Sequence, residues 1–254
     1  MFLFSWRARR QFFYFAIFAL AILAIISGIV WYFWPVPSCL DAKQNQGEQG
    51  IDCGGPCTPC LGEIKDISQK WVRFFKSQEG FYDIAALIEN SNLFAGIPSV
   101  KYRFKLYDAN NVLIAIREAS TFINPGENQV IFESNIFTGP RTPHDVYLEF
   151  DAGKNWKYLK KEQPFLSVVK KDFVNTPFPR LSVEVRNERF TDVKNVLVSA
   201  VLYDVEGNAQ GVSVTKIDVI PAESNQTAFL TWPVSFEKEP EAIEVFVATN
   251  LTGE

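Results

Sequence analysis

The sequence offers thiol chemistry most plainly, because all four cysteines of the chain lie in one short segment. They are Cys39, Cys53, Cys57 and Cys60, in a stretch that is rich in Gly, Pro, Asn and Gln and poor in apolar residues. Such a stretch buries no core of its own, so covalent cross-links are the expected source of its order. On the outer side of a membrane, this even and clustered set predicts two disulfides, in one of three possible pairings.

Zinc is the alternative use of these thiols. Cys57 and Cys60 have the two-residue spacing of a zinc knuckle, but thirteen residues separate Cys39 from Cys53, so a second knuckle is missing. If the segment faces outward, disulfides are the favoured interpretation. The same stretch also holds oxygen ligands that suit calcium, although solvated turn residues explain these positions more simply. They are Asp41, Asn45, Glu48 and Asp52.

The chain has one histidine, His144, which precedes Asp145 in a proline-flanked loop. Such a pair can orient a general base, but neighbouring residues on a strand point to opposite faces, and no Gly-x-Ser-x-Gly motif supplies a nucleophile. The sequence also has neither a phosphate-binding glycine loop nor a His-Glu-x-x-His motif. We therefore expect no catalytic residue, no cofactor and no metal site. A hydrolase with an unrecognised carboxylate pair is the enzymatic alternative.

The cysteine segment follows a stretch of twenty-three uncharged residues, Phe12 to Trp34. A helix of that length reaches roughly 34 Å at 1.5 Å per residue, enough to cross a hydrocarbon core of about 30 Å. Trp31, Tyr32 and Trp34 stand at its end, where amphipathic rings favour the lipid headgroups. The stretch therefore predicts a membrane anchor over residues 12–34, with membrane lipid as its partner.

Basic residues set the expected orientation of this anchor. Arg7, Arg9 and Arg10 precede it without an acid, which predicts a cytoplasmic tail over residues 1–11 and an extracytoplasmic remainder. The expected location is the plasma membrane, spanned once. A cleaved signal peptide and a lipoprotein cut before Cys39 are the rival interpretations, but the apolar core is longer than a signal peptide requires.

The remainder of the chain is acidic. Three of the 25 basic residues and none of the 29 acidic ones precede it, so its formal charge is 22 minus 29, or −7. A domain with this charge and no Lys/Arg-rich patch is not expected to bind nucleic acid.

Beyond the cysteine segment, the pattern is that of β-strands. Val100 to Tyr107 alternates apolar and basic residues with the period of a half-buried strand, and residues 108–111 form a hairpin turn before the returning strand. The pattern returns about 96 residues later, where Leu202-Tyr203-Asp204 repeats Leu106-Tyr107-Asp108. The sequence therefore predicts two copies of one all-β unit, over residues 62–160 and 161–254, behind a cysteine-rich stalk module over residues 35–61.

Two resemblances follow from these residues. Cys39-Leu-Asp41 with Asp52-Cys-Gly-Gly-Pro-Cys57 resembles a DCGGxCxxC module of prokaryotic surface proteins, except that Ala42 stands where that pattern has Gly. Phe104-Lys-Leu-Tyr-Asp108 carries the motif of the FxLYD family, while the second copy has Ala200 in place of the Phe. The FxLYD resemblance implies two tandem immunoglobulin-like β-sandwich domains of an all-β chain, at a cell surface and without a shared catalytic site.

Together these features predict a single-pass, membrane-anchored protein whose extracytoplasmic part binds or scaffolds without catalysis. A protein or an envelope glycan is the expected partner. The second hypothesis is an accessory subunit of an envelope secretion or pilus-type complex, in which the anchor itself makes contacts. The third is the envelope hydrolase named above.

Overall fold

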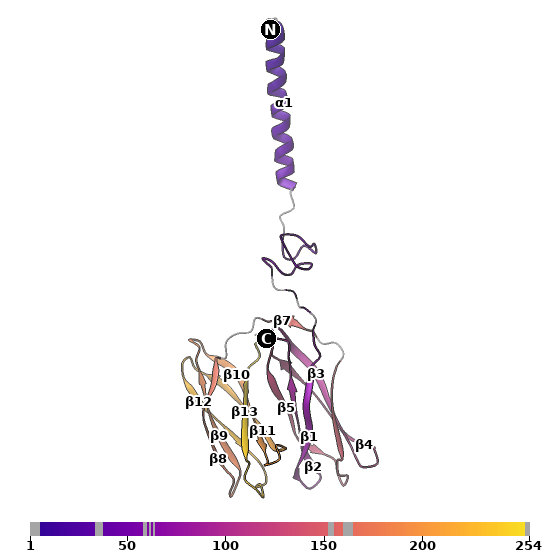
Figure 1. The fold of residues 1–254 in the computed structure, drawn as a ribbon, viewed down its shortest axis with the longest axis vertical. Coiled ribbons are helices and arrows are strands. Elements are labelled where there is room, and N and C mark those ends of the chain that lie inside the picture. The colour runs from indigo at the N-terminus through magenta and orange to yellow at the C-terminus, as the bar shows by residue number, and fades with distance from the viewer. Residues whose placement is uncertain are drawn as a thin grey trace. The chain divides into compact units, whose positions relative to one another are not determined.

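The computed structural model describes residues 6–33, 38–57, 60, 62, 64–151, 155–159 and 165–251. The chain divides into two compact units, Met1–Cys60 and Leu61–Glu254. The first unit contains the helix α1 (Trp6–Phe33) and the cysteine module, and the second contains all thirteen strands that the described residues form (Figure 1).

Helix α1 begins six residues before the predicted apolar stretch, so the helix includes Arg7, Arg9 and Arg10. Its middle is a candidate membrane span, Arg10–Tyr32, and none of that window is buried inside the protein. Ser27 is satisfied within the helix, because its hydroxyl donates to the carbonyl oxygen of Leu23 at 2.6 Å. The apolar side chains of this helix are therefore exposed to the surroundings of the helix and are not packed in a protein core.

The first β-sandwich, called sandwich 1 and described over residues 64–159, has two antiparallel sheets. One has the strand order β1-β2-β5, and the other has the order β4-β3-β6, with the short strand β7 pairing with the start of β3. Between the sheets lie buried side chains such as Ile84, Phe104 and Leu106. The strands are β1 (Ser68–Gln78), β2 (Phe81–Glu89), β3 (Ala95–Tyr107), β4 (Leu113–Ile123), β5 (Asn128–Phe137), β6 (Asp145–Phe150) and β7 (Lys157–Tyr158).

The second β-sandwich, sandwich 2, is described over residues 165–251 and has the same strand order. Its sheets are β8-β9-β12 and β11-β10-β13, around a core that includes Leu181, Val198 and Leu202. The strands are β8 (Leu166–Val174), β9 (Arg180–Asn187), β10 (Val193–Tyr203), β11 (Ala209–Ile220), β12 (Asn225–Thr231) and β13 (Ala242–Ala248). The predicted fold class, all-β with two tandem immunoglobulin-like sandwiches behind one apolar helix, is confirmed. The predicted boundary between the two copies, at residues 160 and 161, lies outside the described residues.

A buried asparagine occupies the same place in each sandwich. The side-chain amide of Asn90 donates to the carbonyl oxygens of Ala95 and Asn124, at 2.7 and 2.9 Å. Asn187 donates to the carbonyl oxygens of Thr191, Ile220 and Pro221, at 2.8 to 3.1 Å. Each asparagine therefore fastens two loops at one end of its sandwich, where unpaired carbonyl groups would otherwise be buried.

The aspartates of the repeated motif open their hairpins in the same way. Asp108 accepts hydrogen bonds from the amides of Asn110 and Val112, at 2.9 and 3.0 Å. Asp204 accepts from the amides two and four residues later, at 2.9 and 2.8 Å, and the bond from Asn208 lowers its pKa. These are turn contacts, as the sequence indicates.

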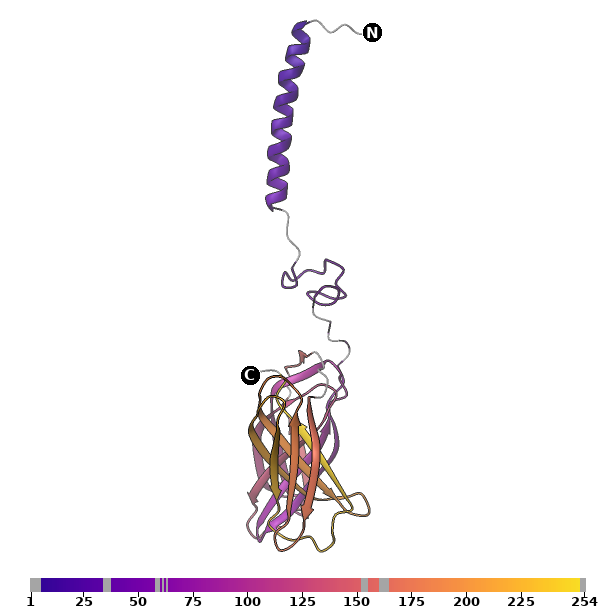
Figure 2. The same ribbon diagram turned by 90° about the vertical axis from the view of Figure 1, so that its left-hand side faces the viewer.

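The two sandwiches pack face to face, sheet β1-β2-β5 against sheet β11-β10-β13. Figure 1 shows them side by side, and in Figure 2, seen from the side of sandwich 2, one lies behind the other. A separate apolar cluster fills this contact, and its buried members are Ala85, Leu87, Val130, Val201, Ala209 and Val212. Strands β2 and β10 are consequently buried on both faces, which gives unit 2 four stacked sheets.

Candidate functional site

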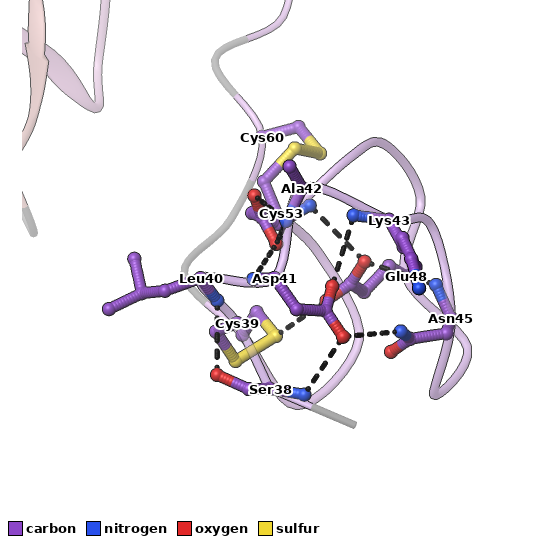
Figure 3. The surroundings of a disulfide bond; sticks show 12 residues. Ser38, Cys39, Leu40, Asp41, Ala42, Lys43, Asn45, Glu48, Cys53 and Cys60 are labelled. Carbon is purple, nitrogen blue, oxygen red and sulfur yellow. Dashed lines mark hydrogen bonds between the residues drawn. A yellow bond between two sulfur atoms is a disulfide. The ribbon is translucent and has the colours of Figure 1, made fainter. Parts of the chain in front are cut away.

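The cysteine module is closed by two disulfides. Cys39 is bonded to Cys57 and Cys53 to Cys60, with Cα atoms 5.6 and 4.8 Å apart. Figure 3 shows the two bonds within one compact loop. This arrangement selects one of the three pairings that the sequence allows. All four sulfurs are engaged with one another, so the segment offers no thiolate to zinc in this state.

The acidic residues of the module accept backbone amides. Both oxygens of Asp52 receive the amide of Ala42, and one also receives the amide of Asp41, at 3.0 to 3.1 Å. The buried Glu48 accepts the amides of Asn45 and Asp52, both at 3.2 Å, and one of its oxygens lies 3.0 Å from the sulfur of Cys57. These carboxylates therefore pair backbone amides that no helix or strand of the described part of the segment pairs.

Asp41 and Asn45 complete this network. The side-chain amide of Asn45 donates to a carboxylate oxygen of Asp41 at 2.8 Å, and this bond lowers the pKa of the Asp41 carboxyl (Figure 3). Asp41 also accepts the amides of Lys43 and Ser38, at 3.0 and 3.4 Å. The four residues considered as calcium ligands thus converge in the fold. The carboxylates of Asp41, Glu48 and Asp52 accept N–H donors of the chain itself, whereas Oδ1 of Asn45 has no hydrogen-bond partner among the described residues.

Left-handed backbone explains why the module contains so many small residues. Ala42 has a φ of 55°, a left-handed conformation that glycine adopts most readily. Gly54 has a φ of 82°, and a Cβ atom there would lie 2.7 Å from the Cβ of Gln49. The turn therefore favours glycine at the two glycine positions of the DCGG sequence, Gly54 and Gly55, and Ala42 occupies its own turn with backbone strain.

The structure brings His144 and Asp145 together, contrary to the expectation that they point apart. Nδ1 of His144 lies 3.1 Å from a carboxylate oxygen of Asp145. The contact forms because His144 precedes β6, where its amide donates to the carbonyl of Tyr107 at 2.7 Å and no strand alternation applies. Both side chains are about half exposed or more, and the groove of about 380 Å³ beside them is lined by no Ser or Cys. Among the described residues, therefore, no Ser or Cys lies in this groove to act as a nucleophile.

The structure describes the side chains of only some of the residues that are predicted to anchor the chain or to set its orientation. Phe12, Trp31 and Tyr32 are exposed on α1, with 72%, 84% and 81% of their surfaces accessible. Trp34 lies outside the described residues, and Arg7, Arg9 and Arg10 lie in the first two turns of the helix.

Sequence reasoning missed the residues that join the sandwiches. Arg73 on β1 donates to the side chain of Asn208 at 2.8 Å, and Trp71 and Phe75 from the same strand pack on the apolar cluster. The signal was present in the sequence, because Ile84 to Ile88 and Val196 to Leu202 are nearly continuous apolar runs. Such runs are typical of strands buried on both faces.

Comparison with known proteins assigns no family to this chain. No protein-family model matches it, and no curated protein is significantly similar to it. Among solved structures, red sea bream transglutaminase aligns with 74% of this chain at 9% identity and a TM-score of 0.22. The chain spans 30% of that protein's length. A similarity at this level supports no conclusion about the activity of either sandwich.

Proposed function

We propose that this chain is a single-pass membrane protein that presents a non-catalytic binding or scaffold domain outside the cytoplasm. The observation that carries the proposal is helix α1, whose 23-residue apolar span is wholly unburied beside a disulfide-bonded module. Disulfides persist in oxidising compartments, which supports an extracytoplasmic location for the module and for the sandwiches after it. The arginines before the span support a cytoplasmic N-terminus.

The paired sandwiches suit a scaffold. Their shared apolar cluster and the hydrogen bonds across it hold two sets of loops in a fixed relation. Rigid β-sheets that carry loops are a common basis for recognition. The corresponding contacts of Asn90 and Asn187, and of Asp108 and Asp204, support the further proposal that both sandwiches are FxLYD-type copies of one unit.

The disulfide at Cys39 bears on the lipoprotein alternative. A lipid on the Cys39 sulfur would exclude the bond to Cys57, because one sulfur cannot form both links. The mass of the chain extracted from membranes separates the alternatives. An uncleaved anchor gives the full-length mass less four hydrogens, whereas a cleaved signal peptide or a lipoprotein lacks the N-terminal helix.

Orientation can be tested with single added cysteines, since the native four are bonded. Asn110 is exposed in the β3–β4 hairpin, and Ser5 precedes the helix. In intact cells, a membrane-impermeant maleimide should label the Asn110→Cys variant and should label Ser5→Cys only after permeabilisation. The reverse pattern would place the sandwiches in the cytoplasm and would refute the proposal. The unmodified chain, treated alike, controls for reaction at the native cysteines.

A further inference from the structure

A groove of about 230 Å³ lies between the sandwiches, at the hairpin end of β1 and β2. Sandwich 1 contributes Phe75 and Asp83, and sandwich 2 contributes Gln210 and the loop from Trp232 to Glu237. This volume is below the roughly 300–1,000 Å³ of pockets for drug-sized ligands, so the groove suits one small unit. It exists only because the sandwiches are packed together.

Two residues that line this groove each carry a buried donor without a hydrogen-bond partner. These donors are Nε1 of Trp232 and Nε2 of Gln210, and with Oδ1 of Asn45 they are the unpartnered buried side-chain atoms in the described part of the chain. Trp232 is 93% buried, since its exposed fraction is 7%. Its ring is held by edge contacts with Phe173 and Phe236, with centroids 6.1 and 5.9 Å apart. Native proteins rarely leave such donors unpaired, so an acceptor from outside the chain is the expected partner.

Asp83 supplies an acceptor on the opposite side of the groove. One of its oxygens receives the amide of Asn135 at 2.8 Å, while the other has no hydrogen bond among the residues that the structure describes. Desolvation by burial raises the pKa of this carboxyl, against the effect of the bond from Asn135. A hydroxyl donated to the free oxygen would offset that desolvation.

The charges of the groove narrow the choice of ligand. Asp83 and Glu237 are acidic, and the single base, Lys76, is engaged with Glu79 at 2.7 Å. An anionic ligand would be repelled, and a cationic one would leave the two N–H donors unpaired. A neutral ring with several hydroxyls meets both requirements, because each hydroxyl both donates and accepts. Phe75 and Phe236 add apolar surface for the ring's carbon face.

We infer that this groove binds one neutral sugar ring of a glycan, held by Trp232, Gln210 and Asp83. The inference rests on the proposed binding role and gives it a ligand class and a site. The site would be formed jointly by the two sandwiches, since each contributes residues to its lining.

The full chain in a detergent without a sugar headgroup can be titrated with glucose, galactose, mannose and N-acetylglucosamine. Concentrations should reach about 50 mM, since single small units commonly bind weakly. Saturation-transfer NMR should detect binding of at least one of these sugars. Trp232→Phe keeps an aromatic ring and removes the donor, Gln210→Leu removes the side-chain amide, and Asp83→Asn removes the carboxylate. Each variant should weaken binding by about 3- to 10-fold. Trp156→Phe, a Trp in sandwich 1 outside the groove, is the matched control and should bind like the parent.

Stability separates a binding role from a structural one. Trp232→Phe replaces a buried indole with a smaller ring, so it should lower the unfolding free energy even though Nε1 has no hydrogen bond to lose. Gln210→Leu, which nearly keeps the size of the side chain, therefore carries the test of binding at parental stability. The absence of binding by the parent to all four sugars overturns the inference, and so does binding that all three groove variants retain. The labelling experiment on topology does not depend on either result.

Discussion

The guanidinium of Arg73 on sandwich 1 donates a hydrogen bond of 2.8 Å to the side-chain carbonyl of Asn208 on sandwich 2. A second contact, at 3.5 Å, reaches the backbone carbonyl of Ala209. Beside these polar contacts lies the apolar cluster in which Leu87 and Val201 are buried. The interface thus has an apolar centre and polar contacts beside it, as a stable protein interface does.

The face of sandwich 1 that is exposed to solvent is charged where the interface between the sandwiches is apolar. Alignment of the two Leu-Tyr-Asp motifs places Lys105 on β3 at the position of Val201 on β10. Lys105 forms a salt bridge with Glu149 at 2.8 Å, whereas Val201 is fully buried. The two sandwiches therefore share a strand order but not an outer surface. The sheet β4-β3-β6 is charged where its counterpart β11-β10-β13 is apolar.

Introducing a charge at the interface should separate the sandwiches. Val201→Lys buries an unpaired ammonium and should cost about 3–5 kcal/mol of unfolding free energy. Denaturant unfolding followed by fluorescence and by circular dichroism should then show two transitions instead of one. The matched control is Lys105→Val at the same position of sandwich 1, which should change stability by no more than about 0.5 kcal/mol. A single transition at the parental midpoint in Val201→Lys would show that the sandwiches do not depend on this contact.

The buried asparagines should be among the most sensitive polar residues. Asn187→Ala leaves three backbone carbonyls without the amide that they share, and Asn90→Ala leaves two. Each substitution should lower the unfolding free energy by about 2–4 kcal/mol, measured by urea denaturation. Asn225→Ala on the exposed strand β12 is the control and should cost about 0.5 kcal/mol or less. Equal effects at all three positions would contradict a structural role for the buried pair.

The sequence predicts local structure well where a single period or turn is decisive. The strand from Val100 to Tyr107 and the turn opened by Asp108 are both observed, because alternation and turn chemistry act within a few residues. Strand β1 was not predicted: Trp71, Val72, Phe74 and Phe75 blur its alternation because both of its faces are partly buried. For this reason the contact between sandwiches was also missed. Which sheet of one sandwich packs on which sheet of the other depends on the side chains of all the strands in each sheet.

The cysteine module shows a different limit. Its composition predicts disulfides, yet the pairing of Cys39 with Cys57 depends on how the loop folds back. That path is set by left-handed residues and by the amides that Asp52 and Glu48 accept. The groove donors Gln210 and Trp232 were not predicted either, because no motif marks an unpaired N–H group.

Relief of backbone strain should stabilise the cysteine module. Ala42 adopts a φ of 55°, which costs an L-residue roughly 1–2 kcal/mol, and glycine recovers most of that after its own entropy loss. Ala42→Gly should therefore stabilise the oxidised module by about 0.5–1 kcal/mol, measured as the share of intact disulfides in glutathione buffers. Gly54→Ala, where a Cβ would meet Gln49 at 2.7 Å, should act in the opposite direction. If Ala42→Gly lowers the share of intact disulfides, the strain assigned to this turn is wrong.

Alkaline pH should weaken the contact between the sandwiches through Tyr203. Burial and a hydrogen bond to Glu244 raise the pKa of Tyr203 to about 12, although a hydrogen bond with Trp71 across the interface acts in the opposite direction. The folded protein thus holds this phenol neutral, while the unfolded chain ionises it near its ordinary pKa of about 10. The contribution of Tyr203 to the unfolding free energy is therefore fully present below pH 10 and is lost as pH rises towards 12.

Tyr203→Phe tests this dependence, because it removes the ionisable group and keeps the ring. Between about pH 9 and 11, the unfolding free energy of the parent should fall more steeply than that of the variant. Tyr107→Phe removes the hydroxyl at the same position of sandwich 1, on the free face, and controls for the loss of a phenol as such. Parallel curves for the parent and Tyr203→Phe would mean that the phenol titrates alike in the folded and unfolded chain. Folding would then not raise the pKa of Tyr203, and this prediction would be wrong.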